Sequence, residues 1–506
     1  MQIHVKQGLI QEEDTELVVV NLFEGVSTPG GALKAVDQAL NGLITQLIEE
    51  KDFRGRLGET HLIYSQGAMP APRVLITGLG KAEIFDLDRA RQAAAAAARR
   101  ARKLGVSRYS TIVHGAGQGD LDYGRAAQAV VEGTFLGLYR FDGYDRDNKP
   151  EETGLGVSQV TVVEVDDSRL DSLRENASIG QVYGEATNWA RDLANEPSNF
   201  LTPGELSRRV SERGQQAGLR VEVLGEAEMA EMGAGSFLGI AQGSDQEGQF
   251  IVLEHLPKGR NAGDLTTVVL VGKAITFDTG GISLKPKTNM WKMKNDMGGG
   301  GATAAALVAT ALLNLPIHAV GIIPATENMP SGRAIKPGDV LTAMNGKTVE
   351  IISTDAEGRQ VLADALCYAQ RFDPAAVVDI ATLTGSIGIA LGRKIAGLFC
   401  DNDELRGRLS DAGQLAGEPL WPMPIYKPYR KLIDSDVADM KNSGGAYGGA
   451  INAALFLKEF AEGYPWAHLD VAGASWQDEQ GPYSVRGGTG YGTRLLIELL
   501  RGYGQE

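Results

Sequence analysis

The clearest evidence for a fold class lies in residues 266–323, which read TTVVLVGKAITFDTGGISLKPKTNMWKMKNDMGGGGATAAALVATALLNLPIHAVGII. The apolar run Thr266–Val271 predicts a buried strand, the Ala-rich run Gly301–Asn314 a helix, and Ile317–Ile323 a second strand. A strand, a crossover helix and a returning strand are typical of a parallel pair. Open α/β sheets bind ligands beyond the carboxyl ends of such strands, which is where the polar residues of this stretch would lie.

The same alternation continues on both sides of this stretch and predicts two α/β domains. The C-terminal one has a central, largely parallel sheet with helices on both faces. Its other predicted strands are Thr348–Ser353, Val377–Ala381 and His468–Val471, and its other helices Gln360–Phe372, Gly449–Glu462 and Gly492–Arg501. The N-terminal one has predicted strands Glu16–Leu22, Arg73–Thr77, Thr111–His114 and Val157–Val165, and a helix Asp86–Lys103. We divide the chain into residues 1–170, a connecting helix at 171–190, and residues 191–506.

Composition narrows the classes of function. The chain has 506 residues and a formal net charge of −15, which disfavours general binding to nucleic acid. We interpret the arginine-rich helix around Arg99, Arg100 and Arg102 as a solvated face. Two cysteines, Cys367 and Cys400, are too few for a disulfide framework and indicate a reducing compartment. The N-terminus has no secretory leader pattern and no stretch is apolar enough to span a membrane, so we expect a cytoplasmic protein.

Three polar clusters interrupt the C-terminal domain and together hold four carboxylates. Asp278 follows the first strand, Asp296 precedes the Ala-rich helix, and Asp355 and Glu357 lie between a strand and a helix. Taken singly, Asp296 reads as a helix N-cap, and Asp355 with Glu357 reads equally well as a solvated acidic turn. In extended backbone the side chains of Asp355 and Glu357 would point to one side, where the repulsion between their charges favours a cation between them.

Four negative charges match two divalent cations, and oxygen ligands without cysteine suit manganese, magnesium or zinc. No two of the six histidines have the spacing of metal ligands, and we interpret His468 as a core residue or as a residue that supports the ligands, rather than as a ligand itself. Lys273, beside cations, could lose its proton and become a nitrogen ligand, which leaves Lys285 and Arg359 as cations for an oxyanion and a bound anion. Singly, each cation also fits a surface salt bridge. With no GxSxG serine and no Cys–His pair, a metal-activated water is the favoured nucleophile.

At this point the residues resemble a known family, the leucyl aminopeptidases, which are cytosolic two-metal aminopeptidases that include bacterial aminopeptidase A. The resemblance is most specific in Val271–Gly299 and Ser353–Arg359. Further matching segments are Ala190–Leu193, Asn195–Pro197, Glu327–Gly332, Lys336–Asp339, Asp436–Asn442 and Trp466–Gly473, with Asp52–Gly55 in the first domain.

The resemblance implies an N-terminal domain similar to macro domains, a homohexamer, and the release of N-terminal, Leu-like residues from peptides by a metal-bridging water. It also implies a role for each matching residue. Asp278 and Glu357 would bridge two metals, with Lys273 and Asp296 completing the tighter site and Asp355 the looser one. Lys285 would polarise the scissile carbonyl, and Arg359 would hold a bicarbonate ion that shuttles the proton, aided by main chain near Leu383. The implied substrate pocket contains Met293, Thr382, Leu383, Gly385 and Ala474.

The chain departs from the family pattern at positions beside the expected ligands. Ala274 replaces a common glycine, Gly300 and Gly301 replace the usual alanines, and Ser353 replaces a common asparagine. Asn295 and Gln360 also differ, and none of these changes removes an expected ligand. Two other interpretations compete with the peptidase. One is a DNA-binding role, known for aminopeptidase A, and the other is a catalytically inactive assembly protein. Net acidity disfavours the first, and the presence of every expected site residue disfavours the second.

Overall fold

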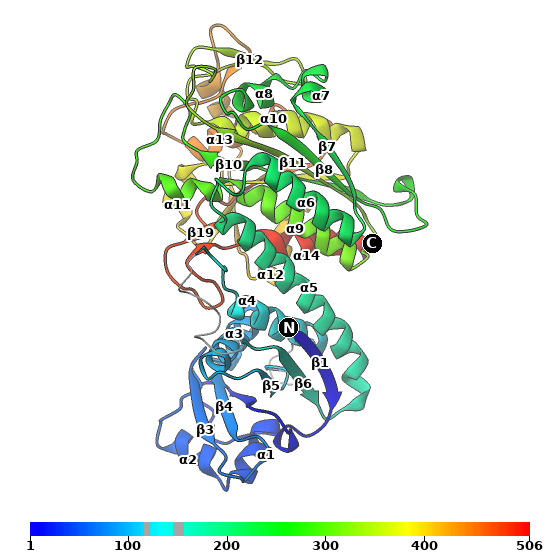
Figure 1. The fold of residues 1–506 in the computed structure, drawn as a ribbon, viewed down its shortest axis with the longest axis vertical. Coiled ribbons are helices and arrows are strands. Elements are labelled where there is room, and N and C mark those ends of the chain that lie inside the picture. The colour runs from blue at the N-terminus through cyan, green and yellow to red at the C-terminus, as the bar shows by residue number, and fades with distance from the viewer. Residues whose placement is uncertain (116–120, 145–155, 506) are drawn as a thin grey trace. The chain divides into compact units, whose positions relative to one another are not determined.

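The computed structural model of the chain describes residues 1–115, 121–144 and 156–505 (Figure 1). The chain forms two compact units, one made of residues 1–188 and 479–485, the other of residues 189–478 and 486–506. Helix α5 (Leu170–Asn195) contains the boundary between them and is longer than the connecting helix drawn from the sequence. The return of segment 479–485 to the N-terminal unit was not foreseen in the sequence.

The N-terminal unit is built on a six-stranded sheet in the order β1-β6-β5-β2-β4-β3, in which only β3 runs antiparallel to its neighbour. The α/β prediction for this unit is confirmed, but the strand predicted at Thr111–His114 is wrong, because β5 ends at Thr111. Val113 is buried outside the sheet, against Ala126 and Ala127 of α4. Its elements are β1 (Gln2–Gln7), β2 (Val18–Leu22), β3 (Thr60–Tyr64), β4 (Arg73–Gly78), β5 (Arg108–Thr111), β6 (Gln159–Glu164), α1 (Gly31–Ala39), α2 (Leu43–Glu49), α3 (Leu87–Lys103) and α4 (Tyr123–Leu138).

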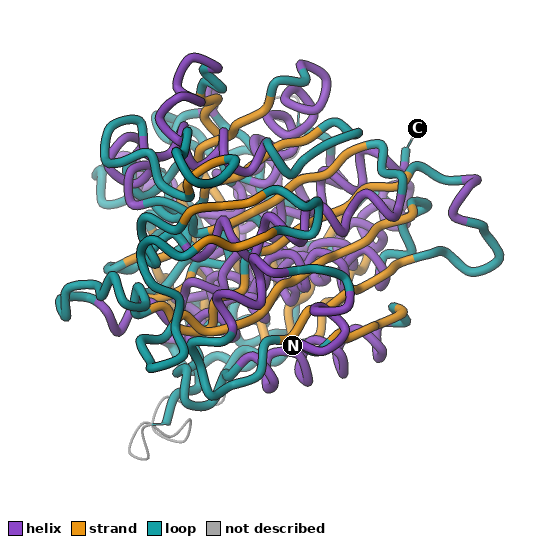
Figure 2. The backbone as a smooth tube through the Cα atoms, turned by 90° about the horizontal axis from the view of Figure 1, so that it is seen from above, coloured by secondary structure: helices purple, strands orange, loops and turns teal. Residues whose placement is uncertain are grey.

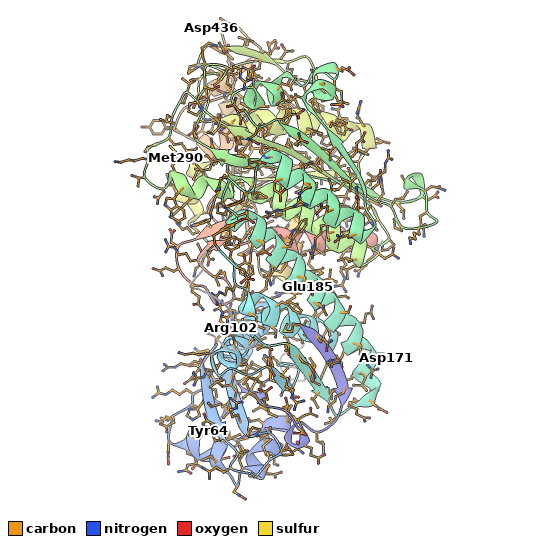
Figure 3. All side chains as sticks on the ribbon, in the orientation of Figure 1. Tyr64, Arg102, Asp171, Glu185, Met290 and Asp436 are labelled. Carbon is orange, nitrogen blue, oxygen red and sulfur yellow. The ribbon has the colours of Figure 1, made fainter. Side chains whose placement is uncertain are left out.

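Two of the three arginines at the end of α3, Arg99 and Arg102, do not lie on the solvated face that the sequence suggests. Arg99 donates from Nη1 to the carbonyls of Gly481 and Pro482, both at 2.8 Å, and from Nη2 to the carbonyl of Ser484 at 2.9 Å. Arg102, labelled in Figure 3, donates to the carbonyl of Leu138 at 2.9 Å. These guanidinium donors are used within the unit, so they do not form a free phosphate-binding stripe.

The C-terminal unit contains a nine-stranded sheet whose central strands are parallel, as predicted. Its order is β16-β15-β18-β14-β9-β11-β8-β7, with β10 paired to β11. Only the pairs β7–β8, β8–β11 and β15–β18 are antiparallel. The strands are β7 (Arg220–Leu224), β8 (Gln249–His255), β9 (Thr267–Gly272), β10 (Ala274–Asp278), β11 (His318–Asn328), β14 (Ala376–Ala381), β15 (Ala396–Cys400), β16 (Leu420–Met423) and β18 (Trp466–Asp470).

Helices cover both faces of this sheet. Helices α6 (Pro203–Ala217), α9 (Gly298–Leu312) and α14 (Thr493–Gly504) lie on one face, and α8 (Gly235–Ala241), α10 (Glu357–Ala369) and α13 (Gly449–Lys458) on the other (Figure 1). Figure 2 shows the strands running side by side among the helices. The remaining elements are α7 (Glu226–Glu231), α11 (Gly385–Leu391), α12 (Asp403–Ala416), β12 (Val340–Thr342), β13 (Thr348–Glu350), β17 (Met440–Lys441), β19 (Trp476–Gln477) and β20 (Gly487–Gly488).

The core explains why these strands read as continuous apolar runs. Val269 and Ile322 of the sheet pack in one cluster with Leu366 of α10, and all three are fully buried. Each such side chain stabilises the fold by about 1.5–3 kcal/mol. Cys367 and Cys400 are buried and free. Among the described residues, no helix is both long and apolar enough to cross a membrane.

The order of the strands creates a place for a site. Strand β9 lies between β11, the next long strand along the chain, and β14, which comes later and pairs on its other side. At such a switch point the chain diverges and leaves a crevice at the carboxyl ends of the strands. The carboxyl ends of β9, β10, β14 and β18 carry Lys273, Asp278, Thr382 and Asp470 at or just beyond their last residues.

Two of the departures from the family pattern face each other in this unit. A Cβ added to Gly300 would lie 2.7 Å from Cβ of Ala274 and 2.9 Å from Cγ2 of Ile323. Gly300 and Ala274 therefore occupy contacting positions, at which the family resemblance implies alanine and glycine, respectively. We expect Gly300→Ala to destabilise the unit by about 1–3 kcal/mol through overpacking, and addition of Ala274→Gly to recover part of that loss. Denaturant unfolding of both single variants and the double variant checks this, and additive effects would contradict it.

Candidate functional site

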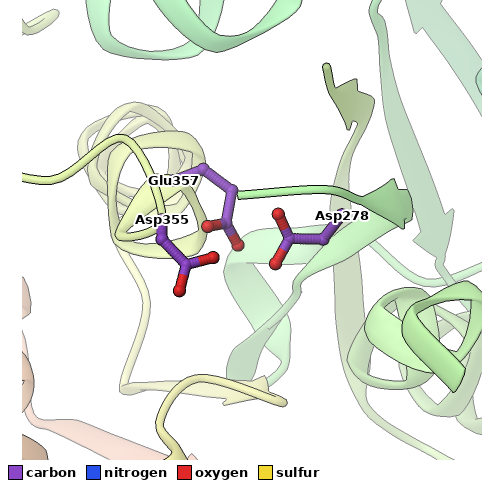
Figure 4. A group of neighbouring side chains, drawn as sticks. All are labelled: Asp278, Asp355 and Glu357. Atoms are coloured by element: carbon purple, nitrogen blue, oxygen red, sulfur yellow. The ribbon is translucent and has the colours of Figure 1, made fainter. Parts of the chain in front are cut away.

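Five predicted metal ligands and one predicted catalytic lysine lie together at the carboxyl edge of the sheet. Lys273 Nζ lies 2.7 Å from Oδ2 of Asp296 and 2.8 Å from Oε1 of Glu357. Lys285 Nζ lies 2.7 Å from Oδ2 of Asp278 and forms a second ion pair with Asp355. One oxygen from each of Asp278, Asp355 and Glu357 lies within 4.8 Å of the others, and Figure 4 shows these carboxylates pointing toward one another.

The backbone brings the carboxylates of Asp355 and Glu357 together in a way that differs from the extended conformation expected from the sequence. Glu357 is the first residue of α10, and Asp355 lies in the turn before it, so the two do not sit on an extended strand. The predicted strand Thr348–Ser353 is correspondingly too long, since β13 ends at Glu350. The turn is held by Thr354, whose Oγ1 donates to the carbonyl of Gly280 at 2.6 Å and accepts from the amide of Ser283 at 2.8 Å.

Asp296 does not cap the following helix. The N-cap position of α9 is Met297, which makes no side-chain capping bond. The Oδ1 atom of Asp296 instead accepts from Lys273 Nζ at 2.9 Å and from Thr382 Oγ1 at 2.6 Å. The capping interpretation is therefore wrong, because a partner distant in sequence holds this carboxylate in the site.

Burial and mutual repulsion set the protonation of this cluster. Burial raises the pKa of Asp278 to about 6, with Glu357 adding to the shift and the two lysines opposing it. Burial also raises the pKa of Asp296 well above its ordinary value. For Glu357, burial is outweighed by the charges of Lys273 and Lys285, which hold its pKa below the usual range. Burial likewise opposes the charge on each lysine, but the carboxylates outweigh it and raise both lysine pKa values.

The donor set fits divalent cations. With all four carboxylates ionised, their charges against those of the two lysines give −2 (−4 + 2) in a largely buried place. Such an excess is costly without a further cation, in agreement with the raised pKa values of Asp278 and Asp296. Among the described residues, Oε2 of Glu357 is buried without a hydrogen-bond partner. Oxygen-rich groups of this kind are the preferred ligands of manganese and magnesium and are accepted by zinc.

Arg359 lies on α10, two residues after Glu357, and is buried. Its Nη1 donates to the carbonyl of Asn442 at 2.6 Å, whereas its Nε is buried without a hydrogen-bond partner in the part of the chain that the structure describes. Burial lowers its pKa to about 10. A guanidinium with an unused buried donor is suited to binding a small anion.

A pocket of about 630 Å³ opens onto the carboxylates. Of the predicted substrate-binding residues, Met293, Thr382, Leu383 and Gly385 line it. Ala474 is buried, and among the described residues it is its neighbours Gly473 and Ser475 that form the wall. The volume is in the range of pockets that enclose a ligand of a few amino acids.

Two residues that the sequence-based analysis left without a role support the site. Asn328 Nδ2 donates to Oδ1 of Asp278 at 2.8 Å. The buried carboxylate of Asp470 accepts from the amide of Leu383 at 3.2 Å and from Oγ1 of Thr384 at 2.6 Å, so it holds the loop after β14 that forms one pocket wall. Both lie in segments that carry the family resemblance, which was the available signal.

Comparison with known proteins agrees with this geometry. The profile described as "Cytosol aminopeptidase family, catalytic domain" matches residues 188–497, and that of the same family's N-terminal domain matches residues 19–148. A probable cytosol aminopeptidase of Roseiflexus castenholzii is 44% identical over 506 residues, covering 100% of both chains. A protein of the same description from Geotalea uraniireducens is 43% identical over 470 residues, covering 92% of this chain and 93% of its own.

Solved structures give the same result. The bottromycin maturation enzyme BotP in complex with Mn is 35% identical, with a TM-score of 0.84 and coverage of 97% of this chain and 100% of its own. A mutant of tomato leucine aminopeptidase is 30% identical, with a TM-score of 0.89 and coverage of 99% and 96%.

Proposed function

Because the chain belongs to the cytosol aminopeptidase family and is therefore a metallo-aminopeptidase, we propose that it releases Leu-like residues, with broad tolerance, from the N-termini of peptides by two-metal hydrolysis. The observation that carries the proposal is the convergence of Asp278, Asp355 and Glu357, with Lys285 beside them, at the edge of one pocket. An acidic centre of this kind takes divalent cations and a substrate's free amine.

Each metal-binding role is assigned to a residue of this cluster. Asp278 and Glu357 would bind both ions, Lys273 and Asp296 one of them, and Asp355 the other. Lys273 would bind as the neutral amine, since a nearby dication favours loss of its proton. When bound, two divalent ions supply Lewis acidity and lower the pKa of a water between them. Manganese is supported by the Mn complex of BotP, and the oxygen-rich donors suit zinc and magnesium as well.

The cations of the chain complete the chemistry. Lys285 would donate a hydrogen bond to the scissile carbonyl oxygen, and its charge would stabilise the oxyanion that develops there. Its place in the pocket and its ion pairs with Asp278 and Asp355 support this role. Arg359, together with main chain near Leu383, would hold a bicarbonate ion, and that ion would transfer the proton. The Nε of Arg359, which is buried and without a hydrogen-bond partner among the described residues, supports this assignment.

The pocket would accept one apolar side chain at a time. Met293 and Leu383 supply apolar surface, and Thr382 and Gly385 leave room beside them. An apolar pocket discriminates by only about 1–3 kcal/mol per methylene, so broad specificity with a preference for leucine is expected. Ala474, behind this wall, would set its depth. The homohexamer and the cytoplasmic location implied by the family resemblance are part of the same proposal.

Metal removal tests the proposal directly. We expect purified protein stripped with a chelator to hydrolyse leucine p-nitroanilide at least about a hundredfold more slowly than protein re-supplied with manganese or zinc. Hydrolysis rates and metal content are measured on the same samples, together with the molar mass. Full activity in demonstrably metal-free protein would contradict the two-metal mechanism, and no activity with any metal at hexameric mass would contradict the substrate class.

A further inference from the structure

A side chain from a distant segment takes the place of a strand where β13 ends. The last pair between β13 and β17 joins Glu350 to Lys441, and the amide of Asn442 extends this pairing by donating to the carbonyl of Glu350 at 2.9 Å. The two strands pair no further. The side chain of Asn442, which is only 1% exposed, instead binds the main chain of residues 352–353.

Asn442 binds these two residues as the peptide group of a neighbouring strand would. Its Oδ1 accepts from the amide of Ile352 at 2.9 Å and from the amide of Ser353 at 3.2 Å. Its Nδ2 donates to the carbonyl of Ser353 at 2.7 Å. A side-chain amide has both a donor and an acceptor, so this one residue satisfies three main-chain groups.

The segment that Asn442 holds leads directly into Asp355. The amide of Asp355 donates to Oγ of Ser353 at 3.3 Å. The other three carboxylates of the centre are buried, whereas the side chain of Asp355 is 37% exposed, so packing alone does not fix it (Figure 4). The position of this carboxylate therefore depends on the main chain of its turn.

Asn442 also contacts the far end of the same segment. Its carbonyl accepts from Nη1 of Arg359, four residues after Asp355, at 2.6 Å. The amide and the carbonyl of Asn442 are thus both bonded, which fixes its backbone and limits the freedom of its side chain. One residue holds the beginning of segment 352–359 by its side chain and the end by its carbonyl.

We propose that Asn442 is a positioning residue for the metal centre, which holds segment 352–359 so that Asp355 can bind the looser metal ion. This inference rests on the proposed two-metal function. Asn442 acts through Asp355 and touches neither an ion nor the substrate. Removing a group that orients a metal ligand typically weakens metal binding by about 10–100-fold.

The tighter site should not depend on Asn442. In the part of the chain that the structure describes, Asn442 makes no hydrogen bond to Lys273 or Asp296. Glu357, which would bind both ions, is buried and pairs with Lys273 at 2.8 Å. A positioning role therefore predicts unequal effects on the two sites, whereas a general loss of stability would weaken both.

The test titrates the full chain with Mn²⁺ after dialysis against a chelator, and electron paramagnetic resonance measures the free Mn²⁺. The unmodified protein should bind two ions with distinct affinities. Asn442→Ala should weaken the looser site by about tenfold or more and change the tighter site by less than about twofold. Hydrolysis of leucine p-nitroanilide by this variant should need more Mn²⁺ for half its maximal rate, but should approach the unmodified kcat at saturating Mn²⁺.

Asn442→Asp separates positioning from charge. This variant keeps the shape of the side chain and the oxygen that accepts from two amides, and those amides favour its ionised form. It loses the Nδ2 donor and places an oxygen against the carbonyl of Ser353. The added negative charge alone would strengthen Mn²⁺ binding, whereas loss of positioning weakens it, and we expect the looser site to weaken.

Asn402→Ala is the matched control. Asn402 caps α12 by accepting from the amide of Leu405 at 2.9 Å, so its loss should lower the thermal midpoint without changing either metal affinity. Equal weakening of both sites in Asn442→Ala, or a looser site in Asn442→Asp that binds Mn²⁺ as tightly as before or more tightly, would overturn the positioning role. Failure of the unmodified chain to bind a second ion would instead refute the proposed two-metal function.

Discussion

Glu357→Gln should lower kcat/KM for leucine p-nitroanilide by roughly 10³-fold or more and reduce the bound metal. The substitution keeps the shape of the side chain but removes the charge that pairs with Lys273 at 2.8 Å. It also places an amide where the structure has a buried carboxylate oxygen, Oε2, without a hydrogen-bond partner among the described residues. An amide is a far poorer ligand than a carboxylate, so both activity and manganese content should fall.

Kinetics and metal analysis on the same preparation check this expectation. Glu404→Gln is the matched control, because Glu404 is an exposed glutamate of α12 that pairs only with Arg408 among the described residues. The control should keep full activity and metal content. A Glu357→Gln enzyme that retained more than a tenth of the activity would contradict the assignment of this residue to the metal centre.

Lys285→Met is expected to lower kcat by about 10²–10³-fold while leaving metal content almost unchanged. Methionine keeps most of the length of the side chain and removes the ammonium that lies beside Asp278 and Asp355 in the pocket. Because the proposed hydrogen bond strengthens as charge develops on the substrate oxygen, the loss should fall on kcat rather than on KM.

The matched control for this lysine is two residues away. Lys287 is exposed and does not line the pocket, so Lys287→Met should behave as the unmodified enzyme. If the activity of Lys285→Met fell only in proportion to lost metal, the lysine would serve to hold the carboxylates, and its role in stabilising the oxyanion would be refuted.

Much of the candidate site could be predicted from the sequence because its residues follow strands. Lys273 and Asp278 follow or end buried apolar strands, and parallel strands bring their carboxyl ends to one edge. Which side chains these residues would contact across the site could not be predicted from the strand pattern. The ion pair of Lys273 with Asp296 and the turn that aims Asp355 depend on contacts between segments far apart along the chain.

The wrong predictions about the fold and its surface have a related cause. The apolar pair at 112–113 resembles the end of a strand, but Val113 is buried by packing against α4. Arg99 and Arg102 resemble a solvated face, but carbonyls from other segments bind them. Lys292 and Arg393, which both line the pocket and pair with Asp478, gave no pattern at all, because 101 positions (393 − 292) separate them in the sequence. Apolar periodicity and charge runs report burial and composition, not the identity of the tertiary partner.

The assignment of segment 479–485 to the N-terminal unit has a consequence for the evolution and engineering of this enzyme. The polypeptide passes from one unit to the other three times, at 188–189, 478–479 and 485–486. An N-terminal fragment cut at residue 188 would lose the carbonyls of Gly481, Pro482 and Ser484 and leave Arg99 part-buried without these acceptors. Neither unit is therefore a self-contained cassette, and a chimera with a related N-terminal unit should need the matching 479–485 segment grafted with it.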